Sequence, residues 1–374
     1  MEFDDLLRLM VEKNASDLFI TAGVAPSMKI NGKIVPVTKS ALGPEVVAQL
    51  IDGIMSPKQR EEFRTTFECN FAITDKKESA RFRVSAFMQR DLAGMVLRRI
   101  ETKIPNVDDL KLPAVIKDLA MTKRGIIVFV GATGTGKSTS LASMIGHRNQ
   151  NSRGHIITIE DPIEFVHQHG GCIITQREVG IDTASFEVAL KNTLRQAPDV
   201  ILIGEIRTRE VMDYAIAFAE TGHLVLATLH ANNANQALDR IIHFFEADRH
   251  NQLYMDLSLN LKGIVAQQLV PSPDGKSRRA CIEVLINTPL IGDYIRKGEI
   301  HEIKSVMKRS RELGMQTFDQ ALYDLYVNGE ITYEDTIKHA DSPNDLRLMI
   351  KLGGNGDTRY LDQATRGLSI DDTE

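Results

Sequence analysis

Residues 131–138 of this 374-residue chain read GATGTGKS, which matches the phosphate-binding pattern GxxxxGK[ST] in full. Glycines at these spacings let the backbone curl, so that successive N–H groups point inward at a β-phosphate, and a following helix adds its positive end. In this pattern the lysine, here Lys137, reaches the β- and γ-phosphates, and the hydroxyl of Ser138 binds Mg²⁺. The residues predicted to bind the nucleotide are Gly131, Thr133, Gly134, Thr135, Gly136, Lys137, Ser138 and Thr139.

The neighbouring segments distinguish this stretch from a chance glycine-rich turn. A short apolar run, 126–130, precedes it and is typical of a strand buried on both faces. A helical pattern follows over residues 137–147. Strand, glycine-rich loop and helix in this order predict a P-loop that binds ATP, and hence an ATP-hydrolysing enzyme.

A second apolar strand, at 200–203, is followed by Gly204 and Glu205. The carboxylate that serves the nucleotide's Mg²⁺, the Walker B acid, belongs at the C-terminal end of such a strand. Because a Gly-Glu pair replaces the usual aspartate, we expect Glu205 near the metal, as a ligand either directly or through water. The alternative is a surface acid at the end of a strand.

A third apolar strand leads into three carboxylates, Glu160, Asp161 and Glu164. ATP hydrolysis needs an acceptor that orients the attacking water. Carboxylates crowded near a nucleotide are costly unless Mg²⁺ or arginine offsets their charge. The spacing alone also fits a solvated acidic loop.

Arginines gather on two strands nearer the N-terminus. In residues 80–88 apolar positions alternate with Arg81, Arg83 and Ser85, which places both guanidinium groups on one face. Arg98 and Arg99 end another strand of the same region. Two like charges on one face favour an anionic neighbour, so these arginines are candidates for contact with a phosphate. The alternative is a solvated basic strand paired with surface acids.

The bulk composition limits the classes of function. The formal net charge is −5, which disfavours nucleic-acid binding because neutralising phosphates supplies much of that affinity. Three widely spaced cysteines fit a reducing cytosol. No stretch approaches the ~18 apolar residues of a membrane span. We therefore expect a soluble, cytoplasmic protein with no nucleic-acid partner.

The pattern of predicted elements changes once along the chain. Residues 1–103 alternate short strands with three helical stretches, including a hairpin around Asn31-Gly32, and predict an α+β domain. Residues 104–113 carry two prolines and are predicted to be a linker. In 114–352 apolar strands alternate with helices, which predicts an α/β domain that becomes wholly helical beyond 285. The polar segment 353–374 is predicted to be disordered.

Four sequence motifs resemble those of one family of proteins, both in their order and in their residues. They are the P-loop, the EDPIE box at 160–164, the Gly-Glu pair at 204–205 and TGHLVLATLHA at 221–231. The order is that of the secretion-ATPase superfamily, and RFRVSAF and the run from TGHLV to RIIHFF look most like the type IV pilus retraction ATPases, PilT and PilU. The resemblance covers about residues 1–350, and the helices at 311–352 are more similar to the PilU branch.

The resemblance implies a RecA-like ATPase domain preceded by a PAS-like domain. It also implies a hexamer at the cytoplasmic face of the inner membrane, working with a PilT-like ATPase and a platform protein of the pilus base. The family's histidine box corresponds to His223 and His230. The residues that the resemblance assigns to catalysis are Glu164, Glu205, Arg83, Arg98 and His230.

One stretch departs from the family pattern. The AIRxxIRE-type helix tied to retraction corresponds to 290–297, where only Ile291, Ile295 and Arg296 fit and Gly292 replaces an arginine. This suits an auxiliary retraction motor. Three other functions stay open: a RecA-like ATPase that translocates nucleic acid, a small-molecule kinase, and an ATPase of pilus assembly or secretion.

Overall fold

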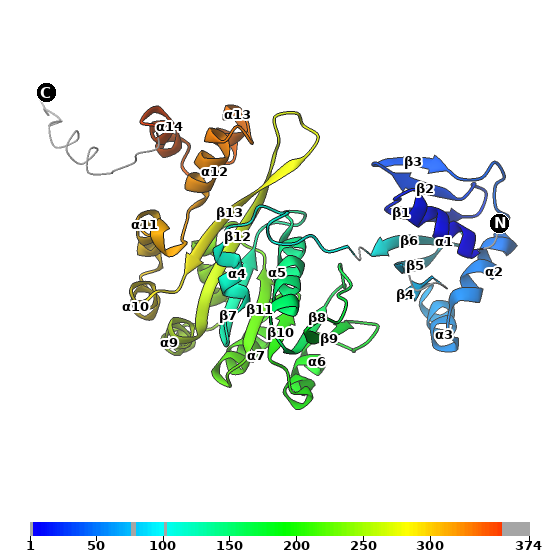
Figure 1. Ribbon diagram of the computed structural model, residues 1–374. Helices are drawn as coiled ribbons and strands as arrows, with labels where there is room; N and C mark the ends of the chain where they lie inside the picture. The colour runs from blue at the N-terminus through cyan, green and yellow to red at the C-terminus, as the bar shows by residue number, and fades with distance from the viewer. Residues whose placement is uncertain (1–2, 76–79, 101–102, 354–374) are drawn as a thin grey trace, which may run out of the picture. The chain divides into compact units, whose positions relative to one another are not determined.

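The computed structural model describes residues 3–75, 80–100 and 103–353 (Figure 1). The tail predicted for 353–374 lies, from residue 354 onward, outside the described residues. Of the described residues, those within 1–106 and 142–205 form one compact unit, and those within 107–141 and 206–374 form another. The predicted boundaries at 103, 113 and 352 stay a prediction.

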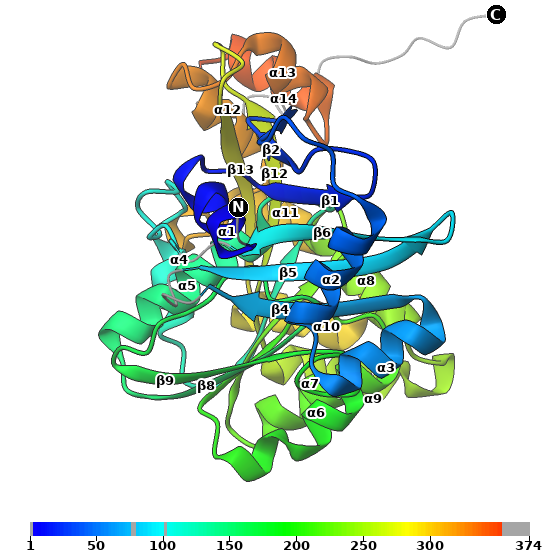
Figure 2. The same ribbon diagram turned by 90° about the vertical axis from the view of Figure 1, so that its right-hand side faces the viewer.

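The N-terminal residues form a six-stranded antiparallel sheet with the order β3-β2-β1-β6-β5-β4 (Figure 2). Its strands are β1 (Asp17–Thr21), β2 (Ser27–Ile30), β3 (Lys33–Pro36), β4 (Glu68–Thr74), β5 (Arg81–Gln89) and β6 (Leu92–Ile100). Three helices belong to the same region: α1 (Phe3–Glu12), α2 (Pro44–Ile54) and α3 (Pro57–Thr66). The predicted alternation in β5 is confirmed, because Phe82, Val84 and Ala86 are buried in the core. Asn31 and Gly32 both have positive φ, as the predicted hairpin turn requires.

The second sheet has seven strands in the order β13-β12-β7-β11-β10-β8-β9. Its strands are β7 (Gly125–Val130), β8 (Gly154–Glu160), β9 (Cys172–Glu178), β10 (Val200–Ile203), β11 (Leu224–Leu229), β12 (Leu261–Pro271) and β13 (Arg278–Ile286). Every residue of β7, β10 and β11 is buried, as expected for parallel strands covered on both faces. The predicted α/β pattern is confirmed.

One helix precedes the first strand of this sheet, and others lie between and after its strands. They are α4 (Val115–Ala120), α5 (Lys137–Asn151), α6 (Phe186–Thr193), α7 (Arg209–Glu220), α8 (Ala234–His243), α9 (His250–Asn260), α10 (Pro289–Lys297), α11 (Ile303–Arg309), α12 (Phe318–Val327), α13 (Tyr333–Lys338) and α14 (Pro343–Lys351). Figure 1 shows α12 and α13 beside one end of the long β12–β13 hairpin. Across the described residues, no helix combines the length and the apolar character that crossing a membrane requires.

Candidate functional site

The P-loop leaves the end of β7 and depends on three glycines with positive φ. The φ angles are 152° at Gly131, 80° at Gly134 and 88° at Gly136. A Cβ on Gly131 would lie 2.5 Å from the carbonyl oxygen of Gln267, and one on Gly136 would lie 2.8 Å from its Nε2. A side chain at Gly131 would therefore meet backbone and one at Gly136 would require the end of the Gln267 side chain to move, whereas Gly134 faces open space. The loop therefore needs glycine for its backbone angles and, at two positions, for its close approach to β12.

The side chain of Lys137, at the end of the loop, bonds back to the backbone at its start. Its Nζ donates hydrogen bonds to the carbonyl oxygens of Gly131 and Ala132, both at 2.8 Å. The hydroxyl of Thr135 donates to the oxygen of Ala132, also at 2.8 Å. The ammonium group thus lies over the strand-proximal part of the loop, close to where inward-facing N–H groups bind phosphate.

Ser138 and Thr139 lie in the first turn of α5, and both are half-buried. The next residue, Ser140, is buried and donates to Oε1 of Gln267 at 2.8 Å. Gln267 therefore ties α5 to β12, and its backbone oxygen and amide lie close to where Cβ atoms on the loop glycines would be. Sequence reasoning missed Gln267, because it lies far along the chain in a strand that had not been predicted.

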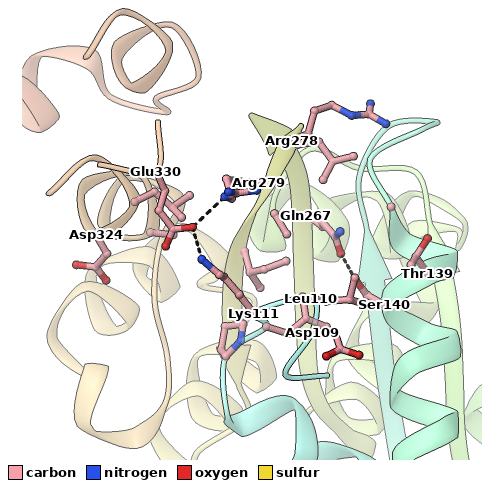
Figure 3. Close-up of a pocket in the computed structure, with 18 of the residues that line it drawn as sticks. Asp109, Leu110, Lys111, Thr139, Ser140, Gln267, Arg278, Arg279, Asp324 and Glu330 are labelled. Carbon is pink, nitrogen blue, oxygen red and sulfur yellow. Dashed lines mark hydrogen bonds and ion pairs between the residues drawn. The ribbon is translucent and has the colours of Figure 1, made fainter. Parts of the chain in front are cut away.

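A pocket of about 650 Å³ opens beside the start of α5 (Figure 3). Gly136, Thr139 and Ser140 line one side and residues 109–113 another, and the rest comes from β12, β13, α12 and the residues that flank α12. The wall also carries charge: Glu330 accepts from Nζ of Lys111 at 2.8 Å and from Nε of Arg279 at 2.9 Å. The hydrogen bond from Lys111 is the largest cause of the lowered pKa of Glu330.

The two histidines of the 221–231 box lie at opposite ends of β11. Leu229 pairs with Val130, the residue before the P-loop, so His230 follows β11 at the P-loop end. The carbonyl of His223 accepts from the backbone N–H of Gly125, at the start of β7. The six residues of β11 separate the histidines by roughly 20 Å. Only His230 is therefore on the side of the phosphate loop.

Glu160, the last residue of β8, is half-buried. Burial raises the pKa of Glu160 to about 7, although two groups stabilise its ionised form by donating hydrogen bonds. The hydroxyl of Thr158 donates to Glu160 Oε1 at 2.6 Å, and Nε2 of Gln176 donates to the same oxygen at 3.2 Å. Glu164, in contrast, is exposed on the loop that follows β8. Sequence reasoning did not anticipate that these two acids differ in environment.

Glu178, at the end of β9, is the most buried acid in this region at 3% exposure. Its Oε2 accepts from the backbone N–H of Ile163 at 3.1 Å, and its Oε1 accepts from Nη2 of Arg83 at 3.2 Å. Nη2 of Arg83 also donates to the carbonyl of Ile163 at 3.4 Å. Arg83 is thus placed against the loop that carries Glu164.

Arg98 lies directly opposite Arg83 in the β5–β6 pairing. Its Nε donates to Oδ1 of the buried Asp17 at 2.8 Å. The side chain of Arg98 is 68% exposed, so the pairing leaves much of the guanidinium in solvent. The two arginines therefore have different acidic partners, Glu178 for Arg83 and Asp17 for Arg98.

The Gly-Glu pair after β10 has a steric explanation. β10 runs parallel to β8, with Ile203 opposite Ile159, and the N–H of Gly204 donates to the carbonyl of Ile159 at 2.7 Å. A Cβ on Gly204 would lie 3.1 Å from the Cα of Glu160. A side chain there would press on the backbone of β8, which favours glycine at position 204. Glu205 is half-buried and follows β10 at the end where Glu160 closes β8.

Gly292, the departure from the family pattern, lies in α10. A Cβ at this position would meet Oδ1 of Asn287 at 3.2 Å and the carbonyl of Ser258, in α9, at 3.3 Å. An arginine here would require α9 and α10 to shift by a few tenths of an ångström. The glycine therefore allows a close approach of these two helices.

The chain matches the family described as "Type II/IV secretion system protein" over residues 3–340. It is 71% identical to the type IV pilus ATPase PilU of Pseudomonas aeruginosa, over the whole chain and 98% of that protein. It is 38% identical to the type IV pilus retraction ATPase PilT of the same organism, over 92% of the chain and all of that protein. The resemblance to PilT and PilU, with PilU the more similar, is confirmed.

Solved structures agree. A crystal structure of the pilus retraction motor PilT with bound ADP aligns with a TM-score of 0.87 and 38% identity, covering 93% of this chain and all of that one. The DotB ATPase of Legionella pneumophila aligns with a TM-score of 0.78 and 26% identity, covering 89% of this chain and 93% of that one. The fold is therefore that of a PilT-like ATPase.

Proposed function

Because the chain belongs to the type II/IV secretion system protein family, we propose that it is an ATP-hydrolysing motor of a type IV pilus, acting in pilus retraction and twitching. The observation that carries this proposal is the complete P-loop, with its glycine backbone and closing lysine, in a chain 71% identical throughout to a PilU ATPase. The glycine at position 292 supports an auxiliary role beside a PilT-like ATPase.

The residues assigned to the nucleotide are those of the P-loop and the pocket beside it. On binding, we propose that Nζ of Lys137 exchanges the carbonyls of Gly131 and Ala132 for β- and γ-phosphate oxygens. The pocket next to Thr139 and Arg278 has the size and mixed lining expected for the base and ribose. The PilT structure holds ADP, which supports use of the same nucleotide here.

Mg²⁺ is proposed to bind the hydroxyl of Ser138, with Glu205 as a ligand either directly or through water. A hydroxyl and a carboxylate are the hard oxygen donors that Mg²⁺ prefers, and both side chains are half-buried. When bound, the ion neutralises charge that develops on the phosphate oxygens.

Glu164 is proposed to orient the attacking water, because it is the exposed acid of the box and can reach solvent. Glu160 is half-buried and already accepts hydrogen bonds from Thr158 and Gln176, so it is the weaker candidate. His230 is proposed to contact the γ-phosphate region from the end of β11. Its position beside Val130 supports that role, whereas His223 lies at the far end of the strand.

Arg83 and Arg98 are proposed to stabilise phosphate charge after exchanging their present carboxylate partners. An arginine that serves this purpose is typically worth 10³–10⁵ in rate, far more than a surface ion pair. The ATPase rates of Arg83→Ala and Arg98→Ala, measured one at a time, distinguish an arginine that stabilises phosphate charge from one that only forms an ion pair. Losses below about tenfold in both would leave these arginines as structural ion pairs.

Assembly and location are proposals drawn from the relatives. We propose a homo-hexamer at the inner face of the inner membrane, working with a PilT-like ATPase and a platform protein of the pilus. The antiparallel sheet of residues 17–100, with its three helices, supports a PAS-like assignment for the N-terminal region.

The test is ATP turnover by the purified full-length chain, with and without Mg²⁺ and with and without DNA. We expect Mg²⁺-dependent phosphate release that DNA leaves unchanged. Absence of phosphate release would contradict the proposed motor function. Strong stimulation by DNA would instead favour a nucleic-acid translocase.

A further inference from the structure

The loop between β8 and β9 makes an unusual connection. These strands are parallel neighbours, with Gly154 opposite Cys172 and Glu160 opposite Glu178. After β8 the chain must therefore return along the full length of that strand before β9 begins. Parallel neighbours are commonly joined by a helix, but residues 161–171 contain none. The return segment thus needs another means of holding its shape.

Side chains of β9 supply that means. The backbone N–H of Ile163 donates to Glu178 at 3.1 Å, and the carbonyl of Phe165 accepts from Nε2 of Gln176 at 2.9 Å. Further along, the N–H of His167 donates to Oε1 of Gln176 at 2.8 Å. The segment 161–167, which we call the acidic loop, therefore runs antiparallel to β9 and is anchored to it by two side chains.

These anchors bracket Glu164. The residue before it, Ile163, is 2% exposed and fixed through its N–H, and the residue after it, Phe165, is fixed through its carbonyl. Glu164 itself is exposed. We propose that Gln176 and Glu178 are positioning residues, which set the direction of the Glu164 carboxylate for ATP hydrolysis. This inference rests on the proposed ATPase function.

Gln176 is suited to the task by its chemistry. Its amide nitrogen donates to Phe165 and to Oε1 of Glu160, and its amide oxygen accepts from His167. A glutamine has two N–H donors and one carbonyl acceptor, and each of these capacities is used here. A glutamate of the same size would lose both donors when ionised and would place its charge against Glu160.

The first experiment compares Gln176→Glu with Gln168→Glu in the full-length protein. Gln168 is exposed in the same stretch of chain and its side chain makes none of the bonds described above, so it controls for the added charge. We expect Gln176→Glu to lower kcat by about tenfold to a hundredfold, because small misplacements of a catalytic group have effects of this size. ATP affinity should change less than about threefold, because the P-loop is intact.

Hydrogen exchange gives a readout that is independent of activity. In Gln176→Glu the donation to the Phe165 carbonyl is lost, which frees the segment between Ile163 and His167, so both amides should exchange faster there and remain protected in Gln168→Glu. Normal kcat together with faster exchange would overturn the positioning role. A lowered kcat with unchanged exchange would overturn it as well.

Glu178→Gln provides a second variant with a milder expected defect. It keeps an oxygen that can accept from Ile163 but removes the charge that faces Arg83. We expect a smaller fall in kcat than for Gln176→Glu, again with ATP affinity retained. Full kcat in both variants would refute the inference while wild-type turnover still supports the proposed function; no wild-type turnover would instead refute the proposed function.

Discussion

The P-loop and the acidic loop both follow a buried strand, yet different parts of the chain determine their shapes. The P-loop takes its conformation from glycines within it, and its lysine bonds to carbonyls only a few residues away. The acidic loop has no glycine, and side chains of the next strand, at 176 and 178, hold its backbone. A backbone conformation can be inferred from local residues, whereas anchoring by another strand cannot. The first loop is suited to binding phosphate and the second to presenting a carboxylate.

If this division is correct, the largest effect comes from the lysine. Lys137→Ala should abolish ATP hydrolysis, because the ammonium serves the phosphates and is not part of the core. The melting temperature should remain within a few degrees of wild type. Phosphate release and thermal unfolding of the purified variant test both statements, and wild-type turnover would contradict the role given to the P-loop.

A substitution in the acidic loop should lower the rate of ATP hydrolysis without weakening ATP binding. Glu164→Gln keeps the shape of the side chain but removes the charge that orients water, so hydrolysis should fall ~10²-fold or more. Nucleotide affinity, measured by titration with a fluorescent ATP analogue, should be retained. A mild defect here together with a severe one in Glu160→Gln would assign the catalytic role to Glu160 instead.

Two glycines of the P-loop make a matched pair. Both have positive φ, but a Cβ on Gly136 would lie 2.8 Å from Gln267, whereas one on Gly134 would meet open space. Gly134→Ala should cost only backbone strain, about 1 kcal/mol. Gly136→Ala should also displace the amide of Gln267, which accepts a hydrogen bond from Ser140, and weaken ATP binding about tenfold. Equal losses of ATP affinity would show that contact with Gln267 does not matter.

The smallest expected effect is a pH dependence of stability that comes from Glu160, the residue before the acidic loop. Burial raises the pKa of Glu160 from 4.5 to about 7, so the folded protein holds this proton more tightly than the unfolded chain does. The contribution of Glu160 to stability is therefore fully present at low pH and is lost as pH rises from about 4.5 through about 7. Across this pH range the melting temperature of Glu160→Gln should fall less than that of wild type, by a few degrees. Parallel curves would contradict the burial argument.

The sequence allowed prediction of the features that depend on neighbouring residues. The P-loop, the hairpin at Asn31-Gly32 and the buried parallel strands follow from glycine positions and apolar runs. The structure confirms the hairpin and the buried strands. The hairpin β12–β13 was not predicted, so Gln267 and the wall of the pocket beside α5 were missed. The roles of Gln176 and Glu178 were also missed, because a glutamine or glutamate in a strand carries no sign of which backbone it will bind.

The most direct test of the account is a chromosomal Lys137→Ala substitution in an organism that carries this chain, scored for surface pili and for twitching. A retraction motor predicts that pili remain on the surface while twitching is reduced, because assembly proceeds without ATP-driven withdrawal. Cells without surface pili would show that this ATPase drives assembly, and would contradict the account.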